Sequence, residues 1–149
     1  MLIEAGRIAW FGREADLVAP AGCETLDADG GCVVPGLIDC HTHTVFAGTR
    51  EDEFAQRLEG KSYAEIAESG GGIRVTVEAV RAAGCDELVE LALPRLRRML
   101  HRGVTTVEIK SGYGLSVEDE LKMLEAVRRL DERVTESMAR FSRSRFEPP

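Results

Sequence analysis

The chain has 149 residues, and because a domain usually has about 100–200 residues, at most one domain is expected. It carries 19 Lys and Arg against 26 Asp and Glu, a net charge of −7, which argues against a nucleic-acid or membrane-surface partner. With 44% hydrophobic residues the sequence is too apolar for a disordered chain. It has neither a run approaching the roughly 18–20 apolar residues of a membrane span nor a secretory signal, which indicates a cytoplasmic protein.

The four cysteines predict no disulfide framework. Cys23, Cys32, Cys40 and Cys85 form no C-x-x-C pair and have no framework spacing. In a reducing cytosol such residues are expected to be buried apolar side chains.

The first part of the chain predicts a small β layer. Short alternating runs at residues 2–3 and 7–11 flank an Ala-Gly pair, which favours a hairpin. A second pair of short strands is expected around residues 27–31, where an Asp-Gly pair is a turn signal. We therefore assign residues 1–34 to a partial β-sandwich.

After Pro35 the pattern changes to an order of strand, helices, strand and helix. Residues 37–41 predict a short buried strand, and residues 44–62 predict a loop because they show no sustained period. Three glycines at 70–72 predict a tight turn or a hinge, and residues 105–110 predict a β-branched strand. This order is typical of β/α units with a parallel sheet.

Two helices are predicted in this second part. The first runs from a cap at Asp86 to about Arg102, is bent by Pro94 and ends at Gly103. Its apolar stripe consists of Leu88, Ala92, Leu96, Met99 and Leu100. The second follows a sequence like a capping box at residues 116–119 and keeps its helical spacing to Leu130. Residues 131–149 break the pattern and are assigned to a divergent tail.

The segment with the most chemical information is Asp39-Cys40-His41-Thr42-His43. Side chains alternate along a strand, so Asp39, His41 and His43 share one face. The two imidazoles can converge on a single ion, and imidazole suits Zn²⁺ and Fe²⁺. Asp39 fits better as a residue that orients the histidines than as a ligand. A coincidental His-x-His in a polar loop is the alternative.

Longer motifs carry a resemblance to a known family. The run Pro35-Gly36-Leu37-Ile38-Asp39-x-His41-x-His43 resembles the first metal-binding strand of the amidohydrolase superfamily of metal-dependent barrel hydrolases. Residues 41–50, 63–67, 70–73 and 103–115 resemble one branch of it, which hydrolyses 4-imidazolone-5-propanoate to N-formimidoyl-L-glutamate in histidine degradation. The resemblance implies an α/β fold in which residues 35–130 form the N-terminal portion of a TIM-like (β/α) barrel.

On the matching positions the resemblance implies a role for four residues. His41 and His43 would bind one divalent metal ion, zinc or iron, and Arg50 and Tyr113 would bind the small-molecule substrate. A guanidinium suits the propionate because it grips a carboxylate with two parallel hydrogen bonds. A tyrosine offers its aromatic face to the planar imidazolone. Whether the intact enzyme forms a homo-oligomer is left open by the sequence.

Several polar residues also have simpler interpretations. Arg50 lies in a charged loop, where an arginine usually forms a solvated ion pair, and Tyr113 between two glycines is more often a turn residue. Glu108 and Lys110 share one strand face, which favours an interior ion pair between them. His101 lies at the end of a helix and interacts favourably with its dipole, so we do not expect it to be a third ligand.

The superfamily's later ligands and proton-transfer groups have no counterpart in the sequence. A catalytic metal site normally takes three protein ligands and a water, and a complete barrel needs about 250 residues. We therefore expect a truncated or frame-shifted chain, with no identifiable proton-transfer residue and little turnover by itself. Another cyclic-amide hydrolase or deaminase of the superfamily, and a non-catalytic metal-binding fragment, stay open as alternatives.

Overall fold

The computed structural model describes the backbone of residues 1–144 and the side chains of residues 1–134. It is a mixed α/β structure whose chain divides into two compact units, Met1–Pro35 and the part from Gly36 onward. No helix in the described part of the chain is long and apolar enough to cross a membrane.

The first unit contains the predicted hairpin. Strands β1 (Leu2–Glu4) and β2 (Arg7–Trp10) pair in antiparallel fashion. The turn between them places Ala5 at φ 48° and Gly6 at φ 74°, the left-handed conformation that two-residue hairpin turns require. A short 3₁₀ helix, η1 (Glu14–Asp16), follows.

The second predicted pair of strands in this unit is wrong. Residues 27–31 form a turn instead, in which the Gly31 amide donates to the Ala28 carbonyl at 2.7 Å and the Asp29 amide to the Asp27 carboxylate at 2.8 Å. The flanking apolar residues Val33 and Val34 are exposed. A turn signal alone does not make a hairpin when the flanks have no buried face to share.

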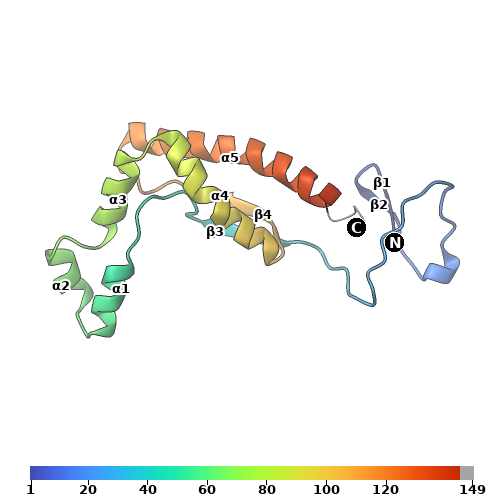
Figure 1. Cartoon of the computed structure of the whole chain (residues 1–149), viewed down its shortest axis with the longest axis horizontal. Helices are drawn as coiled ribbons and strands as arrows, with labels where there is room; N and C mark the ends of the chain where they lie inside the picture. The colour runs from blue at the N-terminus through green and yellow to red at the C-terminus, as the bar shows by residue number, and fades with distance from the viewer. Residues whose placement is uncertain (145–149) are drawn as a thin grey trace. The chain divides into compact units, whose positions relative to one another are not determined.

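The second unit contains the predicted strand–helix–strand order (Figure 1). Strands β3 (Leu37–Thr42) and β4 (Val104–Ile109) pair in parallel, and the helices α1 (Glu51–Leu58), α2 (Tyr63–Glu68), α3 (Ile73–Ala82) and α4 (Cys85–His101) connect them. Helix α5 (Val117–Ser144) follows β4. The described residues thus form an α/β unit with a two-stranded sheet, and a closed barrel is not formed by them.

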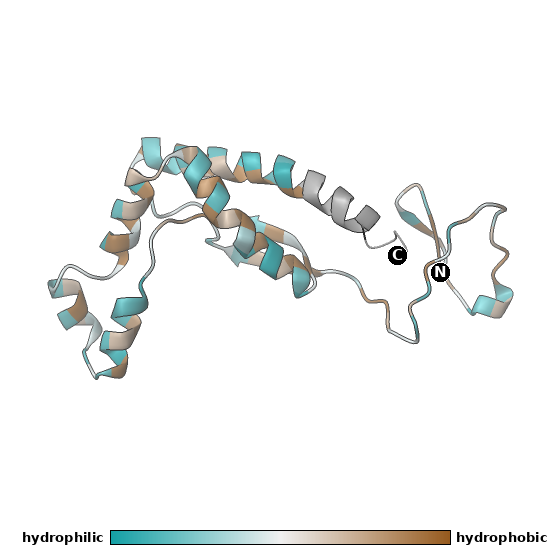
Figure 2. Ribbon diagram, viewed as in Figure 1, coloured by the Kyte–Doolittle hydropathy of each residue, from teal (hydrophilic) through white to brown (hydrophobic). Residues whose placement is uncertain are grey.

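The core of this unit lies mainly between α4 and α5, which lie side by side (Figure 1). The predicted stripe of α4 is buried at Leu88, Ala92 and Leu96, and α5 contributes Met123 and Leu130. Brown and teal residues alternate along the helices, as expected when each buries one apolar stripe (Figure 2). Gly103, at φ 88°, ends α4 as predicted, since its amide donates to the Leu100 carbonyl.

The prediction that residues 37–41 form a buried strand is wrong in its burial. The strand is present, but Leu37 is 57% exposed and Ile38 72%. Its pairing partner in the described residues is β4, on one side, so its second edge and much of its faces stay open.

The prediction of buried cysteines also fails. The side chains of Cys23, Cys32 and Cys40 are exposed, and that of Cys85 is half-buried. The first unit and the two-stranded sheet bury too little surface to cover the first three thiols. All four cysteines are free, in agreement with the absence of a disulfide framework.

Helix α1 lies inside the stretch that we expected to be a loop. Its first turn holds three acidic residues, Glu51, Asp52 and Glu53, which stabilise a helix N-terminus through its dipole. None of its residues is buried. Hydrophobic periodicity therefore did not predict this helix, because it buries no apolar residue and its marker is the acidic first turn.

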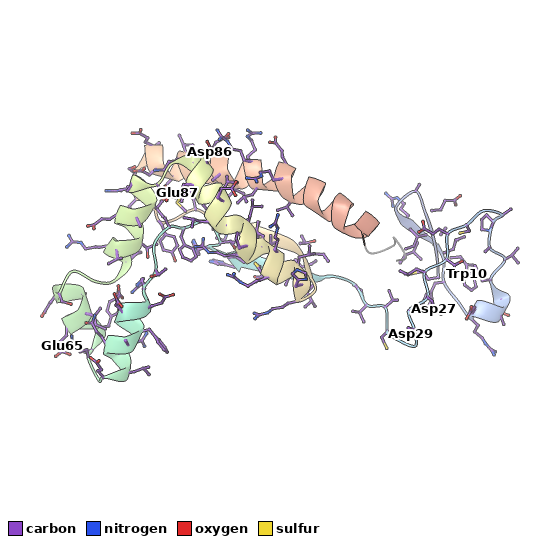
Figure 3. All side chains as sticks on the ribbon, in the orientation of Figure 1. Trp10, Asp27, Asp29, Glu65, Asp86 and Glu87 are labelled. Carbon is purple, nitrogen blue, oxygen red and sulfur yellow. The ribbon has the colours of Figure 1, made fainter. Side chains whose placement is uncertain are left out.

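The boundaries of α4 and α5 also differ from the prediction. Helix α4 starts two residues earlier, with Gly84 rather than Asp86 as its N-cap. The side chain of Asp86, labelled in Figure 3, instead forms an ion pair with Arg129 of α5, with 2.7 Å between oxygen and nitrogen. Helix α5 does not end at Leu130, because Val134 still packs against the core and the helix continues through Ser144. The rest of the predicted tail, residues 145–149, lies outside the described residues.

Candidate metal and substrate site

The two histidines of the predicted metal site lie together where β3 ends. The ring centroids of His41 and His43 are 5.5 Å apart, with 59° between the ring planes. His41 is exposed to solvent, whereas His43 is half-buried. The two rings are therefore neighbours, although β3 ends at Thr42 and His43 is the first residue beyond the strand.

The Nδ1 atom of His43 is buried and has no hydrogen-bond partner among the described atoms. Buried polar side-chain atoms nearly always have a partner, so an orphaned one needs an explanation. The ring lies against Gly112, where an added Cβ would be 3.2 Å from Cε1 and 3.5 Å from Nδ1. Glycine at 112 thus lets the loop approach the His43 ring more closely than a residue with a Cβ could.

Tyr113 reaches the same place from the loop that follows β4. Its ring centroid is 5.4 Å from that of His43 and 6.4 Å from that of Phe46. The parallel register pairs Thr42 with Ile109, so the loops after both strands leave the same edge of the sheet. Tyr113 and His43, to which the resemblance gives roles in one site, thus lie in contact.

A carboxylate that the sequence analysis did not single out holds the loop of Tyr113. Glu120, in the first turns of α5, accepts hydrogen bonds from the amides of Gly114 and Leu115, each at 2.8 Å. Burial raises the pKa of Glu120, but hydrogen bonds from the Ser111 side chain and from these amides outweigh it and lower the pKa. Arg81 binds the Gly114 carbonyl at 2.7 Å. The sequence did contain a signal for this role of Glu120, because an acidic residue near the start of a helix can accept hydrogen bonds from the loop before it.

Arg50 forms an ion pair with Glu53, as expected of an arginine in a charged loop. Its Nη2 and Nε atoms lie 2.6 and 3.0 Å from Glu53 Oε2. Glu53 Oε1 also accepts from the Gly72 amide at 2.8 Å, which ties α1 to the glycine turn. The hydrogen bond from Arg50 lowers the pKa of Glu53 and raises that of Arg50. Tyr63 and Tyr113 also contribute, more weakly, to the raised pKa of Arg50.

Among the other polar residues considered from the sequence, Asp39 contacts the site and His101 lies far from it. The Asp39 carboxylate accepts from the His41 amide at 3.3 Å, which suits the orienting role expected of it. Lys110 and Glu108 form an ion pair, with 2.9 Å between nitrogen and oxygen, but the prediction that it is interior is wrong, because the two side chains are 40% and 52% exposed. His101 is the last residue of α4, next to the start of β4 and therefore at the opposite end of the strands from His43.

Within the described part of the chain, no group of three or more His, Cys, Asp or Glu side chains is placed to hold a metal ion. His41 and His43 can therefore supply two ligands, and the set of three that a catalytic site normally takes is incomplete here. The donors present are two imidazoles, one of which has a buried nitrogen without a hydrogen-bond partner, and imidazole suits a divalent ion such as zinc or iron.

The described residues define an α/β unit with two parallel strands, and the loops that carry His43 and Tyr113 meet at the edge where these strands end. No family model matches the chain. Among curated proteins the chain is similar to imidazolonepropionases. It is 58% identical to the one from Cereibacter sphaeroides (strain ATCC 17023) over 132 residues, which is 89% of this chain and 33% of that protein.

Two further relatives give the same result. The chain is 52% identical to the imidazolonepropionase of Idiomarina loihiensis over 134 residues, and 58% identical to that of Myxococcus xanthus over 131 residues. These matches cover 90% and 86% of this chain but 33% and 31% of the relatives. The chain is thus a close relative of imidazolonepropionases and spans about a third of their length, which confirms the resemblance carried by its motifs.

Proposed function

We propose that the chain supplies the first metal-binding strand and part of the substrate site of a cytoplasmic imidazolonepropionase. Such a hydrolase opens the ring of 4-imidazolone-5-propanoate at a C–N bond and yields N-formimidoyl-L-glutamate. One observation carries the proposal: the ring of His43, whose buried Nδ1 has no hydrogen-bond partner, lies beside the rings of both His41 and Tyr113. The identity of 52–58% to proteins of that name supports the choice of substrate. The free cysteines agree with a reducing compartment.

His41 and His43 would hold one divalent ion, zinc or iron, through ring nitrogens. The chemistry that such an ion supplies when bound is polarisation of the ring carbonyl and a water whose pKa is lowered towards about 7. The residues of this chain have two tasks around it. Asp39 fixes the backbone at His41, and Gly112 leaves room at His43.

Arg50 and Tyr113 would bind the substrate. Arg50 suits the propionate, but Glu53 occupies its Nε and Nη2 atoms, so an acidic substrate must share the guanidinium or displace that carboxylate. Tyr113 stands with its ring against His43 and could face the imidazolone ring while its hydroxyl meets a polar edge. Both side chains orient the substrate rather than move a proton.

A second candidate is a metal-binding chain without activity. The observation in its favour is that residues 1–134 place no third ligand beside the two histidines. The two functions share the histidine pair and differ in turnover. The chain alone should hydrolyse the substrate slowly if it is part of the enzyme, because no proton-transfer group is identified in it, and not at all if it only binds metal.

The test combines metal binding with turnover. Titration of the purified chain with Zn²⁺, and anaerobically with Fe²⁺, should show binding that His41→Ala and His43→Ala each weaken by at least tenfold. His101→Ala removes an imidazole from the far end of the strands and should leave the affinity unchanged. Equal affinities in all four proteins would overturn the metal site. Turnover of 4-imidazolone-5-propanoate, but not of hydantoin or dihydroorotate, would favour the enzyme over the inactive binder.

A further inference from the structure

We propose that Arg95 is a positioning residue of the site, which fixes the segment after β3 and thereby the contact between His43 and Tyr113. The inference rests on the proposed function for its biological meaning, but its geometry and its test do not need a bound metal. Arg95 lies in α4, outside every motif that carried the resemblance. It has no ion pair with a carboxylate among the described residues.

The guanidinium of Arg95 binds backbone rather than side-chain oxygens. Its Nη1 atom donates to the Thr44 carbonyl at 3.0 Å and to the Phe46 carbonyl at 2.8 Å. These two carbonyls flank Val45, which is completely buried in the core. One side chain therefore satisfies two backbone acceptors in an irregular segment, where no strand partner does so.

Arg95 also stacks on the ring of Phe46, with Cζ 3.6 Å from the ring centroid. That distance is well within the range of a cation–π contact. Burial lowers the pKa of Arg95, and the charge of Arg98 adds to the effect, yet a guanidinium stays protonated in proteins. The charge that holds the carbonyls and the ring is thus permanent.

The contacts of Arg95 continue into the site through Phe46. The edge of the Phe46 ring meets the ring of Tyr113, and Tyr113 in turn packs against His43. On the other side, the carbonyl that Arg95 binds at residue 44 directly follows His43 in the chain. Arg95 therefore acts on His43 by two routes, through the backbone and through the aromatic rings.

The shape of the side chain separates this role from simple core packing. A planar guanidinium can serve two carbonyls and stack on a ring at once, whereas the ammonium of lysine is a point charge on a flexible stem. A methionine would fill similar space without either interaction. Arg95→Lys and Arg95→Met thus remove the planar fork while they keep much of the bulk, and Arg97→Met, at an exposed position of the same helix, is the matched control.

The experiment uses the full chain without metal and records long-range ¹H–¹⁵N spectra of its imidazoles. The chain has 3 histidines, so each ring can be assigned by substitution. We expect the His43 signals to shift in both Arg95 variants while those of His101, at the end of the same helix as Arg95, keep their positions. Arg97→Met should leave all three rings unchanged.

Two results would overturn the proposal. Unchanged His43 signals in Arg95→Lys would show that the guanidinium does not position the ring, and equal shifts at His101 and His43 would show a general effect on the fold. If Arg95→Met fails to fold, the lysine variant decides. In a second measurement, Arg95→Lys should weaken Zn²⁺ binding by about tenfold. If neither the wild-type chain nor any variant binds zinc, the proposed function is wrong. The role of Arg95 is decided by the spectra alone.

Discussion

The rings of His43 and Tyr113 lie 5.4 Å apart between centroids, although they follow different strands. Parallel pairing of β3 with β4 explains the contact, because it places the ends of both strands at one edge. The imidazole from the first loop is therefore packed by the second loop. Any change in the loop of Tyr113 should be felt at His43.

Gly112→Ala tests this relationship directly. Gly112 has φ 142°, and an added Cβ would lie 3.2 Å from His43 Cε1, so the ring must move or the loop must shift. We expect altered His43 imidazole signals and at least tenfold weaker zinc binding. The matched control is Gly60→Ala, which also has a positive φ, at 95°, but no heavy atom within 4 Å of the added Cβ. Equal effects of the two substitutions would attribute the change to backbone strain alone.

Local pattern was sufficient for the parts of the site that the strands determine. The His-x-His spacing predicted that His41 and His43 lie together, and the order of the elements predicted a parallel pair of strands. The contacts that fix the site were not accessible in this way. Arg95 and Glu120 bind backbone groups in loops, and such pairings depend on where distant segments meet.

Burial was also poorly predicted, for a physical reason. An apolar run such as residues 37–41 indicates a strand that buries both faces only if other elements cover it. In the described structure β4 alone pairs with that strand, so its apolar residues stay open. Helix α1 shows the converse, since its acidic first turn rather than an apolar stripe marks it.

Gly36→Ala should destabilise the second unit at the base of the sheet. An ideal Cβ on Gly36 would lie 2.0 Å from Thr105 Oγ1 and 2.7 Å from Thr105 Cβ, a separation at which neighbouring backbone must move. Overpacking of this kind typically costs about 1–3 kcal/mol. Urea unfolding monitored by circular dichroism measures the loss.

The double variant Gly36→Ala, Thr105→Gly separates the steric cause from a general effect of alanine. It removes the opposing side chain, so its loss should be smaller than the sum of the two single losses. Strict additivity of the single and double variants would refute the steric explanation.

Leu88→Ala should cost far more stability than Leu91→Ala. Leu88, on α4, is completely buried in the core, whereas Leu91 on the same helix is 36% exposed. Truncating a buried leucine costs about 2–5 kcal/mol because transfer and cavity terms add. The urea midpoint of each variant measures the difference, and similar midpoints would mean that the interface between α4 and α5 is not formed in solution.

Acid should weaken α5 through Glu125. This carboxylate accepts hydrogen bonds from Arg128 at 2.8 and 3.0 Å and from Arg129 at 2.7 Å, and these bonds lower its pKa from 4.5 to about 2. A pKa depressed by folding stabilises the folded state above the unfolded value, and the contribution is lost as the pH falls from 4.5 to about 2.

The measurement compares the thermal midpoint of the wild-type chain with that of Glu125→Gln across this range of pH. The two midpoints should differ most above pH 4.5 and converge as the pH approaches 2. Because the carboxylate is exposed, 1 M NaCl should shrink the difference, since the Debye length is then only about 3 Å. A difference that persists at low pH, or that ignores salt, would show that Glu125 stabilises α5 by something other than its charge.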